Sequence, residues 1–156
     1  ASSVTFSGLG AYSDYKHLQL RAIMRSAGTG YQASLNMRAN GDTASNYWTH
    51  KLAGNGSAVS SGVINTSRFY VDPGALEGST ASGNFSPMIL DILDFSSPNK
   101  NTTIRGTQGV YGVARTSDRW VSLFSGLWNN TAPLTSFEIY IASFEAGTRF
   151  SLYGVK

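Results

Sequence analysis

The chain of 156 residues contains no cysteine, two histidines and four prolines, and charged residues make up only 13% of it. Without cysteine, neither a disulfide framework nor a thiolate metal site can form, so the apolar core or oligomerisation must stabilise the fold. The longest apolar runs are too short to cross a membrane. The N-terminal ASSVTFSGLG lacks the charged-then-apolar layout of a signal peptide. These absences argue against a membrane-inserted protein.

Positive charge is not concentrated anywhere along the chain. Lys and Arg number 12 against 9 Asp and Glu, which gives a net charge of +3, and no basic run occurs. Nucleic-acid binding usually relies on a clustered basic patch. The sequence therefore predicts no nucleic-acid partner.

Recognisable catalytic and metal-binding patterns are also missing. His17 and His50 belong to no H-x-H or H-E-x-x-H pattern, and there is no G-x-S-x-G elbow or phosphate-binding G-x-x-x-x-G-K-[ST] loop. Asp91 and Asp94 are three residues apart, so on a strand they point to opposite faces and cannot act as an acid/base pair. We therefore predict a protein that is not an enzyme and holds no cofactor or metal. A carboxylate pair assembled by the fold and a calcium ion at a sheet edge stay open as alternatives.

What the sequence does contain is strong two-residue alternation, beginning in YKHLQLRAIMRS at residues 15–26. One face of this segment carries Leu18, Leu20, Ala22 and Met24, and the other carries His17, Gln19, Arg21 and Arg25. Alternation of this length indicates a half-buried β-strand. Arginine on the polar face favours fixed, bidentate contacts across a protein–protein interface.

Similar segments recur along the chain and are separated by turn-rich stretches. We expect strands at residues 4–9, 15–26, 32–39, 67–71, 84–95, 102–113, 119–128, 134–143 and 148–155. Residues 46–53 fit either a strand or a short helical turn, and Asp72-Pro73-Gly74 predicts a turn. About 8–10 short strands without a helix of useful length predict an all-β, antiparallel β-sandwich of the jelly-roll type. No repeat or linker interrupts it, so we expect one domain over residues 1–156.

The segment 85–95 is apolar on both faces. Met88, Leu90 and Ile92 share one face, and Ile89, Asp91, Leu93 and Phe95 share the other. Because a sandwich strand already buries one face in the core, the second face must meet a covering loop or another subunit. A buried Asp91 would need a partner such as an arginine.

These features give a set of candidate contact residues. We expect polar interface contacts from Arg21, Arg25 and Arg38, and an oligomer contact from Ile89, Asp91, Leu93 and Phe95. Trp120, Phe124 and Trp128 alternate on one face and predict core. Tyr47 and Trp48 lie between turns and are the best candidates for exposed aromatic residues that stack on a sugar.

Several strings together resemble a β-rich module of tailed bacteriophages and marine phage metagenomes, over about residues 5–156. They are YKHLQLRAIMRS, NGDTASNYWTHKLAGNGS, ILDILDF, NKNTTIRG, SGLWNNTAPLTSF and SLYGVK. The resemblance implies a structural protein of the virion surface, a trimeric jelly roll without catalytic residues. In such phages the module is either a stand-alone virion protein or the tip of a tail fibre.

The resemblance leaves two functions to separate. Because no shaft or coiled coil precedes the module, we expect a capsid decoration (cement) protein that binds the assembled shell as a homotrimer and stabilises it. Its partners would be copies of itself and the major capsid protein or other virion proteins. The alternative is a receptor-binding tail-fibre or spike tip that recognises a host surface polysaccharide.

Overall fold

The computed structural model describes residues 1–79, 82–112 and 119–156, and within these ranges the chain forms β-strands and one short 3-10 helix, Leu9–Tyr12. The strands are β1 (Ser3–Ser7), β2 (His17–Met24), β3 (Gln32–Ala39), β4 (Tyr47–Gly54), β5 (Val59–Thr66), β6 (Phe69–Leu76), β7 (Ser86–Leu93), β8 (Thr102–Tyr111), β9 (Arg119–Trp128), β10 (Ser136–Tyr140) and β11 (Arg149–Val155).

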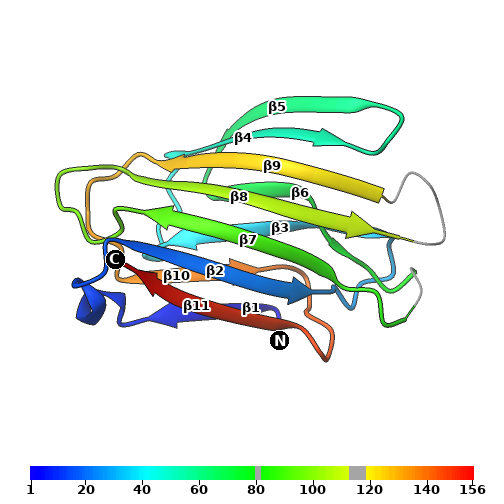
Figure 1. Ribbon diagram of the computed structural model, residues 1–156, viewed down its shortest axis with the longest axis horizontal. Coiled ribbons are helices and arrows are strands. Elements are labelled where there is room, and N and C mark those ends of the chain that lie inside the picture. The colour runs from blue at the N-terminus through cyan, green and yellow to red at the C-terminus, as the bar shows by residue number, and fades with distance from the viewer. Residues whose placement is uncertain (80–81, 113–118) are drawn as a thin grey trace.

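The strands form two antiparallel sheets that pack face to face (Figure 1). The smaller sheet has the order β1-β10-β3-β6, and the seven-stranded sheet has the order β11-β2-β7-β8-β9-β4-β5. The predicted antiparallel β-sandwich is therefore confirmed, while the jelly-roll connectivity stays a prediction. The larger sheet has more strands, and its edge strand β5 extends beyond the smaller sheet at the top of Figure 1.

The core lies between the sheets and follows from the alternation. Leu20 and Leu90 from the larger sheet and Met37 and Phe137 from the smaller one are fully buried in a single hydrophobic cluster. Close packing between the layers also requires small residues. A Cβ on Gly126 would lie 2.6 Å from Cδ1 of Phe69, so only glycine fits under that ring.

Most predicted strands match, and the differences have local causes. The predicted turn at Asp72-Pro73-Gly74 is wrong, because these residues lie inside β6 with a cis Asp72-Pro73 bond. Proline is tolerated there since β6 is an edge strand. Residues 46–53 form a strand rather than a helical turn, β5 was missed, and residue 113 of the predicted strand 102–113 lies outside the described residues.

Candidate functional site

The outer face of the seven-stranded sheet is open to solvent and carries a set of exposed apolar side chains. We call its exposed side chains the apolar sheet face: Ile23, Trp48, Leu52, Val59, Val63, Ile89, Val121 and Leu123. They lie on β2, β4, β5, β7 and β9, on the face opposite the buried residues of β2, β4, β7 and β9 and the half-buried residues of β5. Exposed apolar patches of this kind mark interaction sites.

The strand register places these side chains next to one another. Ile89 lies opposite Thr107, Thr107 opposite Leu123, and Leu123 opposite Leu52, so one row crosses β7, β8, β9 and β4. A parallel row brings Val121 beside Gly109. The apolar side chains on β7, β9 and β4 are therefore neighbours across the sheet, with Thr107 and Gly109 between them on β8.

Gly109 leaves a shallow hollow in this face. The hollow has a volume of about 300 Å³ and is lined by Pro87, Met88, Ile89, Thr107, Gln108, Gly109 and Val121. Because Gly109 has no side chain, the apolar groups of Pro87 and Val121 form its walls. The hollow suits a protruding apolar side chain of a partner.

Charged groups border the apolar sheet face on β2, β7 and β8. Asp91 accepts hydrogen bonds from Gln19 Nε2 at 3.0 Å and from Arg105 Nη2 at 3.2 Å. The bond from Gln19 is the largest influence holding the pKa of Asp91 below its usual value, followed among the lowering effects by Arg105. The predicted ion pair of Asp91 with an arginine is thus confirmed.

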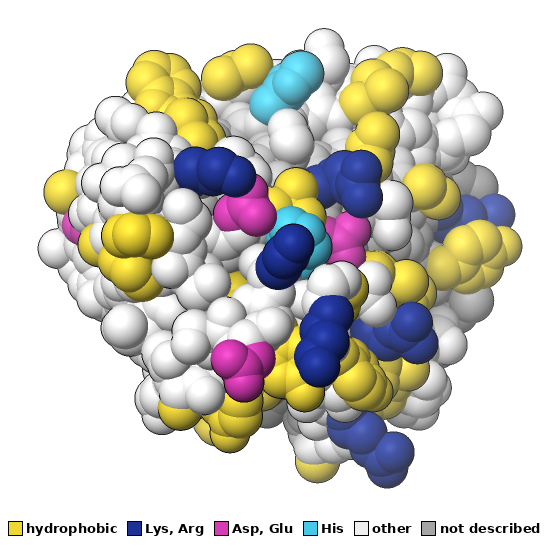
Figure 2. Space-filling model, turned by 60° about the vertical axis from the view of Figure 1, so that its left-hand side comes forward, with side chains coloured by type: hydrophobic (Ala, Val, Ile, Leu, Met, Phe, Trp, Pro, Cys, Tyr) yellow, Lys and Arg dark blue, Asp and Glu magenta, His cyan; other side chains and the backbone are white. Residues whose placement is uncertain are grey.

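A second charged group lies at the end of β7. Lys100 Nζ donates to Asp94 at 2.7 Å, and this bond lowers the pKa of Asp94. The backbone N–H of Asp94 donates to Nδ1 of His17 at 3.0 Å, so that ring nitrogen acts as an acceptor. Figure 2 shows acidic, basic and histidine side chains gathered near the middle of this view, with hydrophobic side chains around them.

The three predicted interface arginines do not lie together. Arg21 is exposed on the outer face of the seven-stranded sheet, 5.7 Å from the ring centroid of Tyr153. Arg38 lies on the other sheet, where it pairs with Glu138 at 3.6 Å and donates to the hydroxyl of Tyr140 at 2.8 Å. Arg21 and Arg38 are therefore on different sheets.

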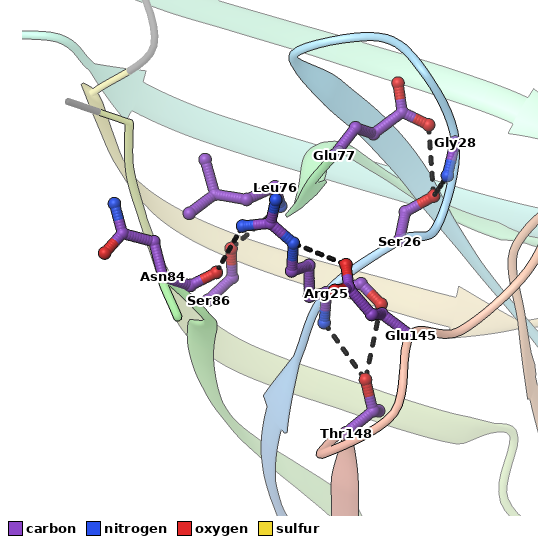
Figure 3. A network of polar contacts seen from close by, with 9 residues as sticks. All are labelled: Arg25, Ser26, Gly28, Leu76, Glu77, Asn84, Ser86, Glu145 and Thr148. Atoms are coloured by element: carbon purple, nitrogen blue, oxygen red, sulfur yellow. Dashed lines mark hydrogen bonds and ion pairs between the residues drawn. The ribbon is translucent and has the colours of Figure 1, made fainter. Parts of the chain in front are cut away.

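Arg25 is buried, so its prediction as an exposed interface residue is wrong. It follows the end of β2, and its side chain is 3% exposed. Its Nε donates to Glu145 at 2.5 Å and its Nη1 to the carbonyl of Asn84 at 3.0 Å (Figure 3). Its backbone also exchanges hydrogen bonds with the hydroxyl of Thr148. Through these hydrogen bonds, Arg25 connects the end of β2 to the segments that precede β7 and β11.

Segment 85–95 follows its prediction only in part. Ile89, Asp91 and Leu93 lie on the outer face, and Ile89 is 45% exposed, so no loop of the described residues covers it. Phe95 is fully buried, which corrects its predicted place beside Ile89. The strand ends at Leu93 and Asp94 adopts a φ of 48°, which breaks the alternation and turns Phe95 into the core.

The two aromatic residues predicted to stack on a sugar, Tyr47 and Trp48, lie in different environments. Tyr47 is fully buried, and its ring packs edge-on against Phe69 with centroids 5.0 Å apart. Burial raises the pKa of Tyr47 to about 12. The prediction of an exposed aromatic at this position is therefore wrong, whereas Trp48 is exposed and belongs to the apolar sheet face.

A separate cleft opens between the edge strands β1 and β11. It has a volume of about 490 Å³ and is lined by Thr5, Phe6, Ser7, Leu9, Tyr12, Tyr15, Leu18, Leu152, Tyr153 and Gly154. Tyr15 packs on Gly154 so closely that a Cβ there would lie 2.5 Å from Cγ of the ring. None of the lining side chains is charged.

Of the apolar sheet face, Leu52 on β4 and the residues on β5 and β9 were not predicted from the sequence, whereas the exposure of Trp48 was. The signal was present in RWVSLFSGLW, where Val121 and Leu123 alternate with the buried Phe124 and Trp128. That segment is apolar on both faces, as 85–95 is. Applying the same reasoning to it finds both exposed residues.

Within the described residues, no cluster of three or more His, Asp or Glu side chains is arranged to hold a metal ion. None of these residues forms a helix with the length and apolarity needed to cross a bilayer. Comparison of the chain with protein-family models, curated protein sequences and solved structures finds no match. The resemblance to the phage module accordingly stays a prediction.

Proposed function

We propose that this chain is a structural protein of a bacteriophage virion, a decoration protein that binds the assembled shell as a homotrimer and stabilises it. The phage context and the three-fold stoichiometry come from the sequence resemblance. The observation that carries the proposal is the apolar sheet face, which is exposed in a chain with few charged residues. A surface of this kind gains free energy when another protein covers it.

The stabilising mechanism requires no covalent chemistry. A protein that binds the assembled shell but not its separate subunits shifts the assembly equilibrium by its binding free energy. The continuous rows on β7, β8, β9 and β4 provide a broad apolar contact, and the bordering Asp91–Arg105 pair provides polar specificity. The hollow at Gly109 provides a place for one protruding side chain.

The test is binding to shells that lack decoration. Purified protein is added to isolated phage capsids, its copies are counted by electron microscopy, and the stability of the shell to heat is compared with and without it. We expect many symmetrically placed copies and a raised disruption temperature. Sedimentation of the free protein as a monomer at high concentration, together with no shell binding, would contradict the proposal.

A matched pair of variants ties that test to the apolar sheet face. Leu123→Glu places a charge within the face, while Ser3→Glu places the same charge on an exposed position of the smaller sheet. We expect only the first to lose shell binding. The alternative function, a polysaccharide-binding tip, receives less support because Tyr47, one of its two candidate aromatics, is buried.

A further inference from the structure

The edge strand β5 lacks the features that keep sheet edges from pairing. Its eight residues, VSSGVINT, contain no charge and no proline, and in the described part of the chain β4 is its only neighbour in the sheet. An unprotected edge of this length is a template for another strand.

The other three sheet edges are protected. β6 carries Pro73 and Asp72, β11 begins with Arg149, and β1 has only five residues. Proline, charge and shortness are the usual means of preventing edge pairing. The contrast singles out β5 as the edge that is left open.

The β4–β5 hairpin determines which backbone groups of β5 are free. The N–H of Asn55 donates to the carbonyl of Ala58 at 3.2 Å, so these two residues form a hydrogen-bonded pair at the turn. Hydrogen-bonded residues alternate along an antiparallel ladder. Residues 60, 62, 64 and 66 therefore bond to β4, and the N–H and C=O groups of Val59, Ser61, Val63 and Asn65 point to the open edge.

We infer that β5 pairs antiparallel with β5 of a second copy of this chain, about a two-fold axis at Ser61. In this register Val59 lies opposite the second copy's Val63, Val63 lies opposite its Val59, and the two Ser61 residues face each other. Each pair exchanges two backbone hydrogen bonds. The two valine pairs lie on the outer face, where cross-strand β-branched pairs stabilise a sheet.

A second copy fits this edge better than an unrelated strand. The arrangement is self-complementary, as a two-fold interface requires, and the absence of charge on β5 removes repulsion between identical strands. Pairing joins two seven-stranded sheets into one, and the apolar sheet face continues across the junction. The inference goes beyond the proposed function and does not rest on it.

Opposite charges at Ser61 test the register. Ser61 is exposed, so Ser61→Lys and Ser61→Glu both leave the fold intact, but each places like charges opposite one another in the pair. By sedimentation over a concentration series, we expect each variant alone to associate at least tenfold more weakly than the wild type. An equimolar mixture should recover wild-type association, and Ser61→Ala should match the wild type. A mixture as weak as its components, or wild-type association in Ser61→Lys, overturns the inference.

Hydrogen exchange gives an independent test of β5 pairing. The amide protons of Val59, Ser61 and Val63 should gain protection as protein concentration rises, while those of residues 60, 62, 64 and 66 are protected at every concentration. Protection of the first set that does not change with concentration overturns the inference.

Failure of this inference is distinguishable from failure of the proposed function. Across a β5 pair the two Leu123 positions lie about 24 Å apart, five strand spacings. This distance exceeds the screening length in physiological salt. Leu123→Glu should therefore remove contacts of the apolar sheet face and leave β5 pairing unchanged. The Ser61 variants also add a charge to that face, opposite Leu52, so β5 pairing is judged from their equimolar mixture, which restores pairing while both charges remain on the face.

Discussion

The Leu123→Glu substitution gives the most direct measure of whether the apolar sheet face is buried in an assembly. Leu123 is 50% exposed and lies between Thr107 and Leu52 in the central row. Fully burying a leucine contributes about 1.5–3 kcal/mol. Half of the side chain is already covered, so the wild-type residue gains about 1 kcal/mol per interface on assembly.

The glutamate adds a larger penalty. A carboxylate enclosed in an apolar contact either pays for its desolvation or takes up a proton. Protonating a glutamate of ordinary pKa at pH 7 costs about 3.7 kcal/mol, which sets the upper limit of this penalty. With the lost burial, Leu123→Glu weakens association by about 4–5 kcal/mol, roughly a thousandfold.

The same reasoning predicts a pH dependence. At pH 5 protonation costs only about 1 kcal/mol, so association of Leu123→Glu should recover by about a hundredfold between pH 7 and pH 5. Leu123→Gln has no titrating group and should show no comparable recovery. Binding to undecorated capsids at both pH values measures the two variants, with Ser3→Glu as the charge control. Wild-type association of Leu123→Glu at pH 7 would show that this face stays in solvent.

Three further predictions concern the stability of the single chain and are measured by urea unfolding. Glu145→Ala leaves the buried Arg25 without its carboxylate partner. Because Glu145 is 39% exposed, we expect the free energy of unfolding to fall by about 2 kcal/mol, less than for a fully buried pair. A change below about 0.5 kcal/mol would contradict this. Gly154→Ala forces a Cβ against the ring of Tyr15 and should cost about 1–3 kcal/mol and alter the near-UV circular dichroism of the tyrosines, whereas an unchanged spectrum would argue against that contact. The pKa of Asp91 is lowered in the folded state, so its stabilisation is present above the unfolded pKa of about 4 and is lost as pH falls through the folded pKa. Asp91→Asn should therefore reduce stability at pH 7 and flatten its decline in acid, and an identical pH profile in both proteins would refute the attribution.

Strands could be predicted from the sequence where apolar and polar residues alternate along them. Segments such as residues 32–39, with their inward Leu35 and Met37, were predicted because each inward position is apolar. β5 was missed because its inward positions include Ser60 and Gly62, which are only half-buried where β5 extends beyond the smaller sheet. Because no layer lies beneath it, β5 lacks the regular inward apolar residues from which the other strands were predicted.

The position of a candidate site residue could be predicted only where the local strand geometry determines which face its side chain lies on. Ile89 was placed on the outer face because it lies within a regular strand. Arg25 was misplaced because Glu145, its partner, is 120 residues away in sequence. Phe95 was misplaced because a single left-handed residue, Asp94, reverses the alternation. Long-range pairing and backbone irregularities are both invisible to a periodicity argument.

The apolar sheet face and the β5 edge lie in different directions, and this matters for the proposed function. Contacts of the face act perpendicular to the seven-stranded sheet, whereas β5 pairing acts within its plane. A two-fold edge contact closes after two copies, so it cannot by itself extend a layer. Combined with the three-fold contact that the resemblance implies, it links each trimer to its neighbours. Under the proposed function, decoration proteins would thus hold one another as well as the shell, and an equimolar mixture of Ser61→Lys and Ser61→Glu should stabilise the shell more than either variant alone.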